Sequence, residues 1–186
     1  MFKIYTYLVF LLVSCVALVS SGTGWCPTPN NPAKMVWTNF FGTWYEYASY
    51  GDGTTRVCYK CMKYSFTPTS ESSVDALRTY EFKIFSIPGS SSYSIQPESY
   101  SDFLMVGQSF ITPNKKLWLI DTDYNNYAIL WSCSDNSGMF YTQSSWILTR
   151  NQTESLNKDV QSKLEKVLKA HKMSWNDYGS VTQRGC

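Results

Sequence analysis

The sequence contains little of what catalytic and metal sites are usually built from. Histidine occurs once in the 186 residues, at His171, and cysteine occurs six times. Cys58 and Cys61 form the one CxxC spacing, so a zinc site has too few ligands. A redox CxxC usually opens a helix, whose dipole lowers a thiol pKa, whereas the aromatic residues around this pair are typical of a strand. The sequence therefore argues against a metal centre and against dithiol redox chemistry.

Charge of one sign and long hydrophobic runs are also scarce. Lysine and arginine total 16 and aspartate and glutamate total 14, which gives a net charge of +2. Because there is no basic patch, we expect no nucleic-acid partner. After residue 22 no second apolar run is long enough to span a membrane as a helix, so we expect the mature chain to be soluble.

The one long apolar run lies at the very start of the chain. A short positive start precedes residues 4–19, which are almost wholly apolar, and small residues follow. This order is typical of a secretory signal peptide, and we expect cleavage after Ser21. The sequence thus predicts a signal peptide over 1–21 and one secreted domain over 22–186. A bacterial lipoprotein site at Cys15 is disfavoured because the apolar run continues past it.

Short runs of alternating apolar and polar residues follow one another along most of the mature chain. Turn residues separate them at short spacing, which predicts an antiparallel meander and not a βαβ fold. About eight strands fit, and a meander of that length can close into a barrel with room for one small ligand. The predicted strands cover residues 40–50, 57–66, 74–80, 81–87, 102–110, 116–124, 126–134 and 139–149, with a loop at 88–92.

The pattern changes after residue 150, where apolar residues recur at helical spacing. These residues are Leu156, Val160, Leu164, Val167 and Leu168. They predict one amphipathic helix of about four turns that packs on the outside of the sheet. Thr153 or Ser155 is the expected N-terminal cap.

Three short motifs occur in order along this predicted meander. Gly42-Thr43-Trp44-Tyr45-Glu46 lies on the first strand, Thr122-Asp123-Tyr124 lies mid-chain, and Arg150 follows the last strand. In this order they resemble the lipocalins, and most closely the branch of apolipoprotein D, insect bilin-binding proteins and crustacyanin-like carotenoid-binding subunits. Cys26-Pro27-Thr28-Pro29 and residues 145–151 are similar to that branch too, so the resemblance covers nearly all of the mature chain.

The resemblance assigns all three motifs to the closed end of a barrel. Gly42 allows a close backbone approach as the strand begins, and Trp44 fills the floor. The guanidinium of Arg150 is expected across the Trp44 ring, a cation–π contact worth about 1–2 kcal/mol when partly desolvated. Thr122-Asp123-Tyr124 forms a turn at the same end, where the aspartate accepts hydrogen bonds from backbone N–H groups.

The resemblance also implies two disulfides. Cys26 is expected to bond to Cys133, and Cys186 to a cysteine of the second strand. Either Cys58 or Cys61 could fill that place; we expect Cys58, which leaves Cys61 free. Five cysteines follow the predicted cleavage site, and this odd number leaves one thiol over.

The function implied is that of a secreted carrier, not an enzyme. Its ligand is a small hydrophobic molecule such as a retinoid, bilin, carotenoid, steroid or fatty acid. No metal is expected, and no cofactor beyond a chromophore or lipid held as cargo. A homo- or hetero-oligomer and a cell-surface receptor stay open as partners. The candidate ligand-binding residues, taken from alternating strand positions, are Trp44, Phe82, Ile84, Phe103, Met105, Leu117, Tyr127, Ile129, Trp131 and Trp146.

Two alternatives depend on the surplus cysteine. A thiolate at Cys61 inside the barrel would suit an isomerase of the lipocalin prostaglandin-synthase type, although no histidine lies near it in the sequence. A thiol that pairs between chains, together with exposed aromatic residues, would suit a subunit of a pigment complex or a structural protein. Asn151-Gln152-Thr153 is a glycosylation sequence, and we expect a glycan on Asn151.

Overall fold

The computed structural model describes residues 20–51, 57–70, 73–135 and 137–186. The predicted signal peptide, residues 1–21, lies almost wholly outside these ranges. Within them no helix is both long and apolar enough to cross a membrane.

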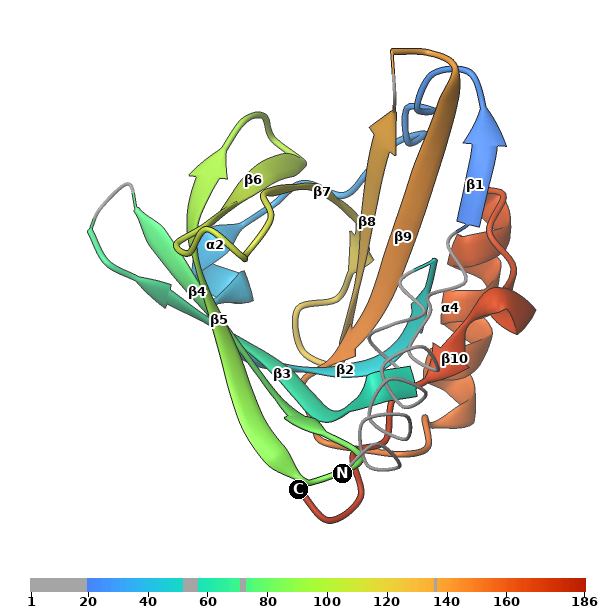
Figure 1. The fold of residues 1–186 in the computed structure, drawn as a ribbon. Coiled ribbons are helices and arrows are strands. Elements are labelled where there is room, and N and C mark those ends of the chain that lie inside the picture. The colour runs from blue at the N-terminus through green and yellow to red at the C-terminus, as the bar shows by residue number, and fades with distance from the viewer. Residues whose placement is uncertain (1–19, 52–56, 71–72, 136) are drawn as a thin grey trace, which may run out of the picture.

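Eight consecutive antiparallel strands, β2 to β9, form a closed barrel (Figure 1). Each strand pairs with the next, and β9 also pairs with β2, as in Tyr45 opposite Thr149. The eight-stranded antiparallel up-and-down barrel predicted from the sequence is therefore confirmed. The strands are β2 (Gly42–Tyr50), β3 (Tyr59–Pro68), β4 (Val74–Phe82), β5 (Ile87–Pro97), β6 (Asp102–Gly107), β7 (Lys115–Thr122), β8 (Tyr127–Asp135) and β9 (Phe140–Thr149).

Two short strands extend the sheet beside the barrel seam. β1 (Ser20–Thr23) pairs with the start of β9, and β10 (Gly179–Ser180) pairs with the end of β2. The prediction divided the middle of the chain wrongly: residues 74–82 form one strand, and the expected loop at 88–92 lies within β5. Serines and glycine along β5 gave it the composition of a loop, but the full ladder with β4 holds it extended.

One long helix, α4 (Lys158–Ala170), packs on the outside of the barrel, as predicted (Figure 1). Leu164 and Leu168 are fully buried against the outward side chains of β8 and β9. The cap differs from the prediction: the side chain of Asn157 accepts the N–H of Asp159 at 2.8 Å, so the helix begins later than Thr153 or Ser155 would place it. The helix is followed by a 3-10 turn, η1 (Trp175–Asp177).

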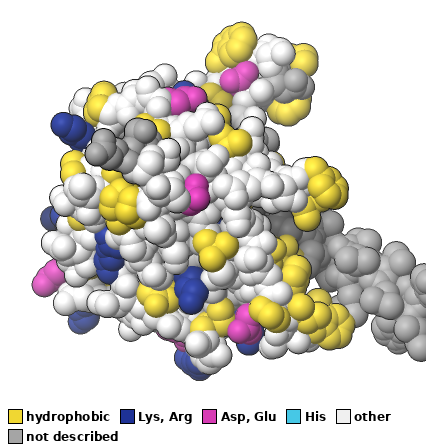
Figure 2. Space-filling view, turned by 90° about the vertical axis from the view of Figure 1, so that its left-hand side faces the viewer, with side chains coloured by type: hydrophobic (Ala, Val, Ile, Leu, Met, Phe, Trp, Pro, Cys, Tyr) yellow, Lys and Arg dark blue, Asp and Glu magenta, His cyan; other side chains and the backbone are white. Residues whose placement is uncertain are grey.

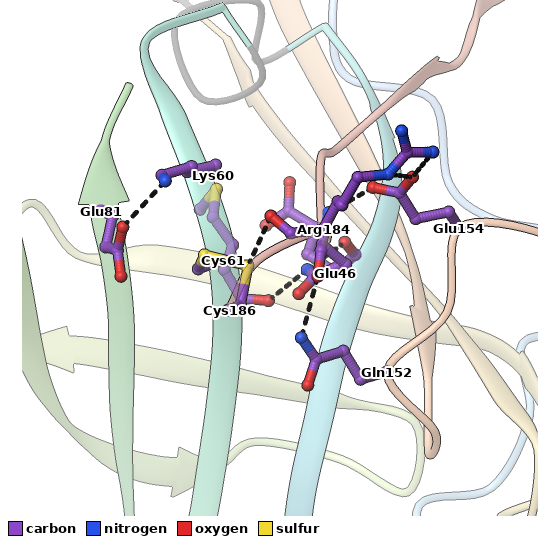
Figure 3. The surroundings of a disulfide bond; sticks show 10 residues. Glu46, Lys60, Cys61, Glu81, Gln152, Glu154, Arg184 and Cys186 are labelled. Carbon is purple, nitrogen blue, oxygen red and sulfur yellow. Dashed lines mark hydrogen bonds and ion pairs between the residues drawn. A yellow bond between two sulfur atoms is a disulfide. The ribbon is translucent and has the colours of Figure 1, made fainter. Parts of the chain in front are cut away.

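Two disulfides fix the ends of the described chain. Cys26 bonds to Cys133, as predicted, and Cys186 bonds to Cys61 (Figure 3). The expected bond between Cys58 and Cys186 was wrong. The register of β3 shifts between Lys60 and Lys63, and Cys61 has a positive φ of 58° there.

This shift turns the Cys61 segment toward the C-terminal tail. The N–H of Cys61 donates to the carbonyl of Thr182 at 2.9 Å, which brings Cys186 to the same point. Cys58 is disulfide-bonded as well. Among the described residues no cysteine is a free thiol.

Candidate ligand-binding site

The guanidinium of Arg150 closes the bottom of the barrel over the ring of Trp44. Its Cζ atom lies 3.7 Å from the ring centroid. Its nitrogens donate to the carbonyls of Tyr124 at 2.8 Å, Phe41 at 2.9 Å and Asn39 at 2.6 Å. Partial burial lowers the pKa of Arg150, but a guanidinium stays charged at physiological pH. The arginine therefore joins the segment that precedes β2 and the turn that follows β7 to the floor.

Trp44 is wholly buried in a cluster of aromatic rings. Its indole N–H donates to the carbonyl of Phe40 at 2.8 Å, in the short helix α2 (Trp37–Phe40). The Phe40 ring lies 4.9 Å from that of Trp44 and 5.1 Å from that of Phe66, measured between centroids. Gly42 lies between Phe40 and Trp44 with φ of +96°, a backbone conformation that residues other than glycine rarely adopt. These contacts seal the closed end against water.

The turn at the same end is organised by Asp123. Its Oδ1 accepts the backbone N–H groups of Asn125, Asn126 and Tyr127 at 3.2, 2.8 and 3.1 Å. Partial burial by itself would raise the pKa of Asp123, but these bonds and one from the Asn126 side chain outweigh it and lower the pKa. Thr122 and Tyr124 lie in this turn as the resemblance implied.

Beyond the floor, an apolar pocket occupies the barrel interior. Its volume is about 20 Å³, which is room for about one water molecule. Most of its wall is aliphatic or aromatic, with two cationic side chains among them. The lining residues are Tyr64, Phe66, Arg78, Tyr93, Met105, Lys115, Leu117, Leu130, Trp146 and Leu148.

Five of the ten candidate ligand-binding residues belong to this interior cluster. They are Trp44, Phe103, Met105, Leu117 and Trp146. Trp44 forms the floor rather than the pocket wall, whereas Met105, Leu117 and Trp146 line the pocket directly.

Three other candidates were wrongly assigned to the interior. Tyr127, Ile129 and Trp131 face outward and pack with Leu164 and Leu168 of α4. The first five residues of β8 are all buried, because the helix covers one face of the strand and the barrel interior covers the other. Without polar residues at alternate positions, the sequence could not show which face is inside.

The last two candidates, Phe82 and Ile84, are exposed at the turn between β4 and β5. Their exposed fractions are 38% and 49%. In a meander, this turn and those after β6 and β8 lie at the end opposite Trp44, around the open mouth. Other large apolar side chains are exposed there too, namely Phe85, Ile87, Phe110, Ile111, Met139 and Phe140. Figure 2 shows hydrophobic side chains standing out along the edge of the molecule.

Two charged residues that line the pocket, Arg78 and Lys115, were not among the candidates predicted from the sequence. Both follow the alternation of their strands: Arg78 shares a face with the buried Val74 and Ala76, and Lys115 shares one with Leu117. The alternation of these strands therefore indicated that both side chains point inward, but the predicted lining residues were all apolar or aromatic.

A larger recess of about 370 Å³ lies outside the barrel, between residues 27–30 and 171–178. Burial, the main cause, raises the pKa of Tyr178 well above its ordinary value, and the Tyr178 hydroxyl donates to Ser145 at 2.7 Å. Burial also lowers the pKa of His171. Within the described residues, no three His, Cys, Asp or Glu side chains gather closely enough to hold a metal ion.

Comparisons with known proteins agree with this architecture. A model of the lipocalin / cytosolic fatty-acid binding protein family matches residues 106–185. The chain is 28% identical to the Lazarillo protein of Schistocerca americana, over 95% of this chain and 81% of that protein. It is 25% identical to apolipoprotein D of Cavia porcellus, over 69% and 68% of the two chains. Lobster apocrustacyanin A1 shares the fold with a TM-score of 0.72 at 17% identity, over 88% and 91% of the two chains.

Proposed function

The chain belongs to the lipocalin family, and we propose that it carries one small hydrophobic ligand in the barrel interior. The observation that carries this proposal is the sealed aromatic floor below an apolar pocket. Trp44 and Arg150 close one end, and aliphatic side chains such as Leu117 and Leu130 line the space beyond it. A pocket of this kind favours an apolar guest that is largely withdrawn from water.

Ligand entry must enlarge the pocket. A small lipophile needs about 300 Å³ or more, far above the volume between the present side chains. Arg78 and Lys115 are long, only partly buried side chains in the pocket wall, and their rotation opens space without disturbing the packed floor. We therefore place the guest on the mouth side of Phe66 and Trp44.

We propose a binding role and not an enzymatic one. The thiol-dependent isomerase required a thiolate at Cys61, and Cys61 is bonded to Cys186. Without that nucleophile, the alternative loses the residue on which it depended. The disulfides also support secretion, because such bonds persist in oxidising compartments.

A direct binding experiment tests the carrier function. The delipidated protein is mixed with a retinoid, a bilin, a carotenoid, a steroid and a fatty acid, and native mass spectrometry reports the complexes. We expect one equivalent of at least one compound to bind. Leu117→Trp fills the pocket and should weaken binding at least tenfold, whereas Leu77→Trp, at an exposed position of β4, should leave it unchanged. Failure of every compound to bind would refute the proposal.

The exposed apolar side chains around the mouth favour a second candidate, assembly into a pigment complex or other oligomer. Phe85, Phe110 and Ile111 have exposed fractions of 66%, 101% and 76%, and such groupings often mark contact surfaces. Sedimentation over a range of concentrations tests this. A monomer at all concentrations, for wild type and for Phe110→Ser alike, would exclude self-association.

A further inference from the structure

A polar recess lies on the outside of the barrel, beside the Cys61–Cys186 disulfide. Its volume is about 400 Å³, within the range of about 300–1,000 Å³ in which proteins bind small molecules. Figure 3 shows this disulfide between Glu81 of β4 and Gln152, and both of those side chains line the recess. Hydroxyl, amide, charged and aromatic side chains are mixed in the rest of the lining, among them Tyr45, Lys63, Thr79, Ser90 and Gln183.

The floor of the recess is a row of outward side chains that crosses four strands. Tyr45 of β2 pairs with Lys63 of β3. Lys63 also pairs with Thr79 of β4, which in turn pairs with Ser90 of β5. Directly paired residues share one face of a sheet, and Trp44, which precedes Tyr45, is buried inside the barrel. The row therefore lies on the outer face, where the register of four strands holds its members in place.

Gln183, which lines the recess, contains an acceptor without a donor. The residue is only 4% exposed, and its Nε2 donates to the carbonyls of Glu46 and Met62, each at 2.9 Å. Because both neighbours are acceptors, the amide nitrogen must face them, and Oε1 is left without a donor among the described residues. The buried hydroxyl oxygen of Thr79 also has no partner in the described part of the chain. Such groups are rare in native proteins and call for a functional explanation.

The lining suits a carbohydrate better than a lipid or an ion. Thr79 and Ser90 supply hydroxyl groups beside the unpaired amide oxygen, and sugar hydroxyls both donate and accept hydrogen bonds. Lys63 and Glu81 bring one charge of each sign, so the recess selects neither an anion nor a cation. Tyr45 adds an aromatic ring, on which the C–H face of a sugar can pack.

The expected glycosylation site lies at the edge of this recess. Asn151 is exposed and directly precedes Gln152, whose Nε2 donates to the carbonyl of Gln183 at 2.9 Å. The Thr149 hydroxyl donates to the carbonyl of Asn151 at 2.9 Å and lies 3.5 Å from the carbonyl of Tyr45. These contacts hold Asn151 beside the Tyr45 end of the row. A sugar linked to this asparagine is therefore within reach of the recess.

Attachment to the chain favours this sugar over a free one. A free saccharide loses translational freedom when it binds, which weakens its binding. A tethered sugar has an effective concentration in the millimolar range, so it fills even a weak site.

We propose that the N-linked glycan on Asn151 folds back and that its first sugars occupy the recess. There a sugar hydroxyl or N-acetyl N–H donates to Oε1 of Gln183, and the glycan covers the Cys61–Cys186 bond. The inference rests on the glycan expected at Asn151 and is independent of the ligand carried inside the barrel.

Reduction of the two disulfides tests the inference. Protein from a eukaryotic host is treated with a small reductant under native conditions, and alkylation with peptide mapping follows each bond. Because exchange rates depend on access to the sulfurs, wild type should lose the Cys61–Cys186 bond about fivefold more slowly than Asn151→Gln. The Cys26–Cys133 bond, which does not line the recess, is the internal control and should be reduced equally fast in both. Equal rates for Cys61–Cys186, or wild type without a glycan on Asn151, would overturn the inference.

A filled recess separates the seat of the glycan from its mere presence. Ser90→Trp places a large ring in the recess and displaces the glycan, so an N-glycan amidase should release it from the folded protein about fivefold faster than from wild type. Ser92→Trp is the matched control, at an exposed position of the same outer face of β5 and outside the lining, and should match wild type. Thermal melts verify that both variants are folded. Unchanged release from folded Ser90→Trp would overturn the inference.

A soluble sugar distinguishes the two sources of carbohydrate. Protein from a bacterial host, which carries no glycan, is reduced in the presence of N,N′-diacetylchitobiose at about 10 mM. This disaccharide should protect the Cys61–Cys186 bond less than the attached glycan does. Protection by the soluble sugar alone, with none from the attached glycan, would assign the recess to a sugar of another molecule and overturn the role of Asn151.

Discussion

Replacing Arg150 with methionine removes the charge that joins the closed end and keeps much of the aliphatic stem. The bonds to the carbonyls of Tyr124 and Phe41 are partly buried, and each is worth about 1–1.5 kcal/mol. The contact with Trp44 at 3.7 Å adds about 1 kcal/mol. The bond to Asn39 is exposed and contributes little. We expect Arg150→Met to lower the free energy of unfolding by about 3–4 kcal/mol.

Urea unfolding followed by tryptophan fluorescence, with the disulfides intact, measures this loss. Arg150→Lys keeps a cation over the ring but cannot span the separate carbonyls, so it should lose about half as much. Arg184→Met is the matched control: its side chain is 84% exposed and pairs with Glu154 at 2.9 Å, so the change should be about 0–1 kcal/mol. A loss below about 1 kcal/mol for Arg150→Met, or one equal to that of Arg184→Met, would refute the role given to this arginine.

Four further outcomes follow from the described contacts. Trp44→Ala should lower the free energy of unfolding by about 3–5 kcal/mol, and a melt without loss would contradict its place in the floor. Proteolysis without reduction should yield a peptide pair linked through Cys61 and Cys186, and Cys186→Ser should cost about 2–4 kcal/mol. A pair that links Cys58 to Cys186 would contradict the structure. The lowered pKa of Asp123 contributes stability above its unfolded pKa of about 4, which is lost as pH falls through the folded pKa, so urea midpoints of Asp123→Asn should fall less steeply in acid than those of wild type. Asn151 is exposed, so protein from a eukaryotic host should carry a glycan mass that Asn151→Gln removes.

The closed end could be predicted from the sequence because its residues act through contacts that require particular side chains. Trp44, Arg150 and Asp123 each make the contact that the motif implied. Most of the strands could also be predicted, because alternation shows wherever one face of a strand meets water. Where both faces are covered, as on β8, alternation disappears and Tyr127 was placed inside.

The pairing of Cys186 could not be predicted for a different reason. Cys58 and Cys61 are three residues apart, and the choice between them depends on a local shift in the ladder between β3 and β4. The sequence of that segment gives no sign of the shift. A positive φ usually indicates glycine, but here it is adopted by Cys61. The inward position of Arg78, in contrast, could be predicted from the alternation of β4. It was overlooked because a charged side chain was not expected inside the barrel.

The pairing of β2 with β9 has a consequence for synthesis. Tyr45 and Thr149 are neighbours across this seam, yet nearly the whole barrel lies between them in the chain. During synthesis on the ribosome, one edge of β2 therefore stays unpaired until β9 has emerged. Folds dominated by such distant pairings form slowly, and the nascent chain is most open to aggregation during that interval. A chain interrupted before Arg150 would lack the cation that completes the Trp44 end of the barrel.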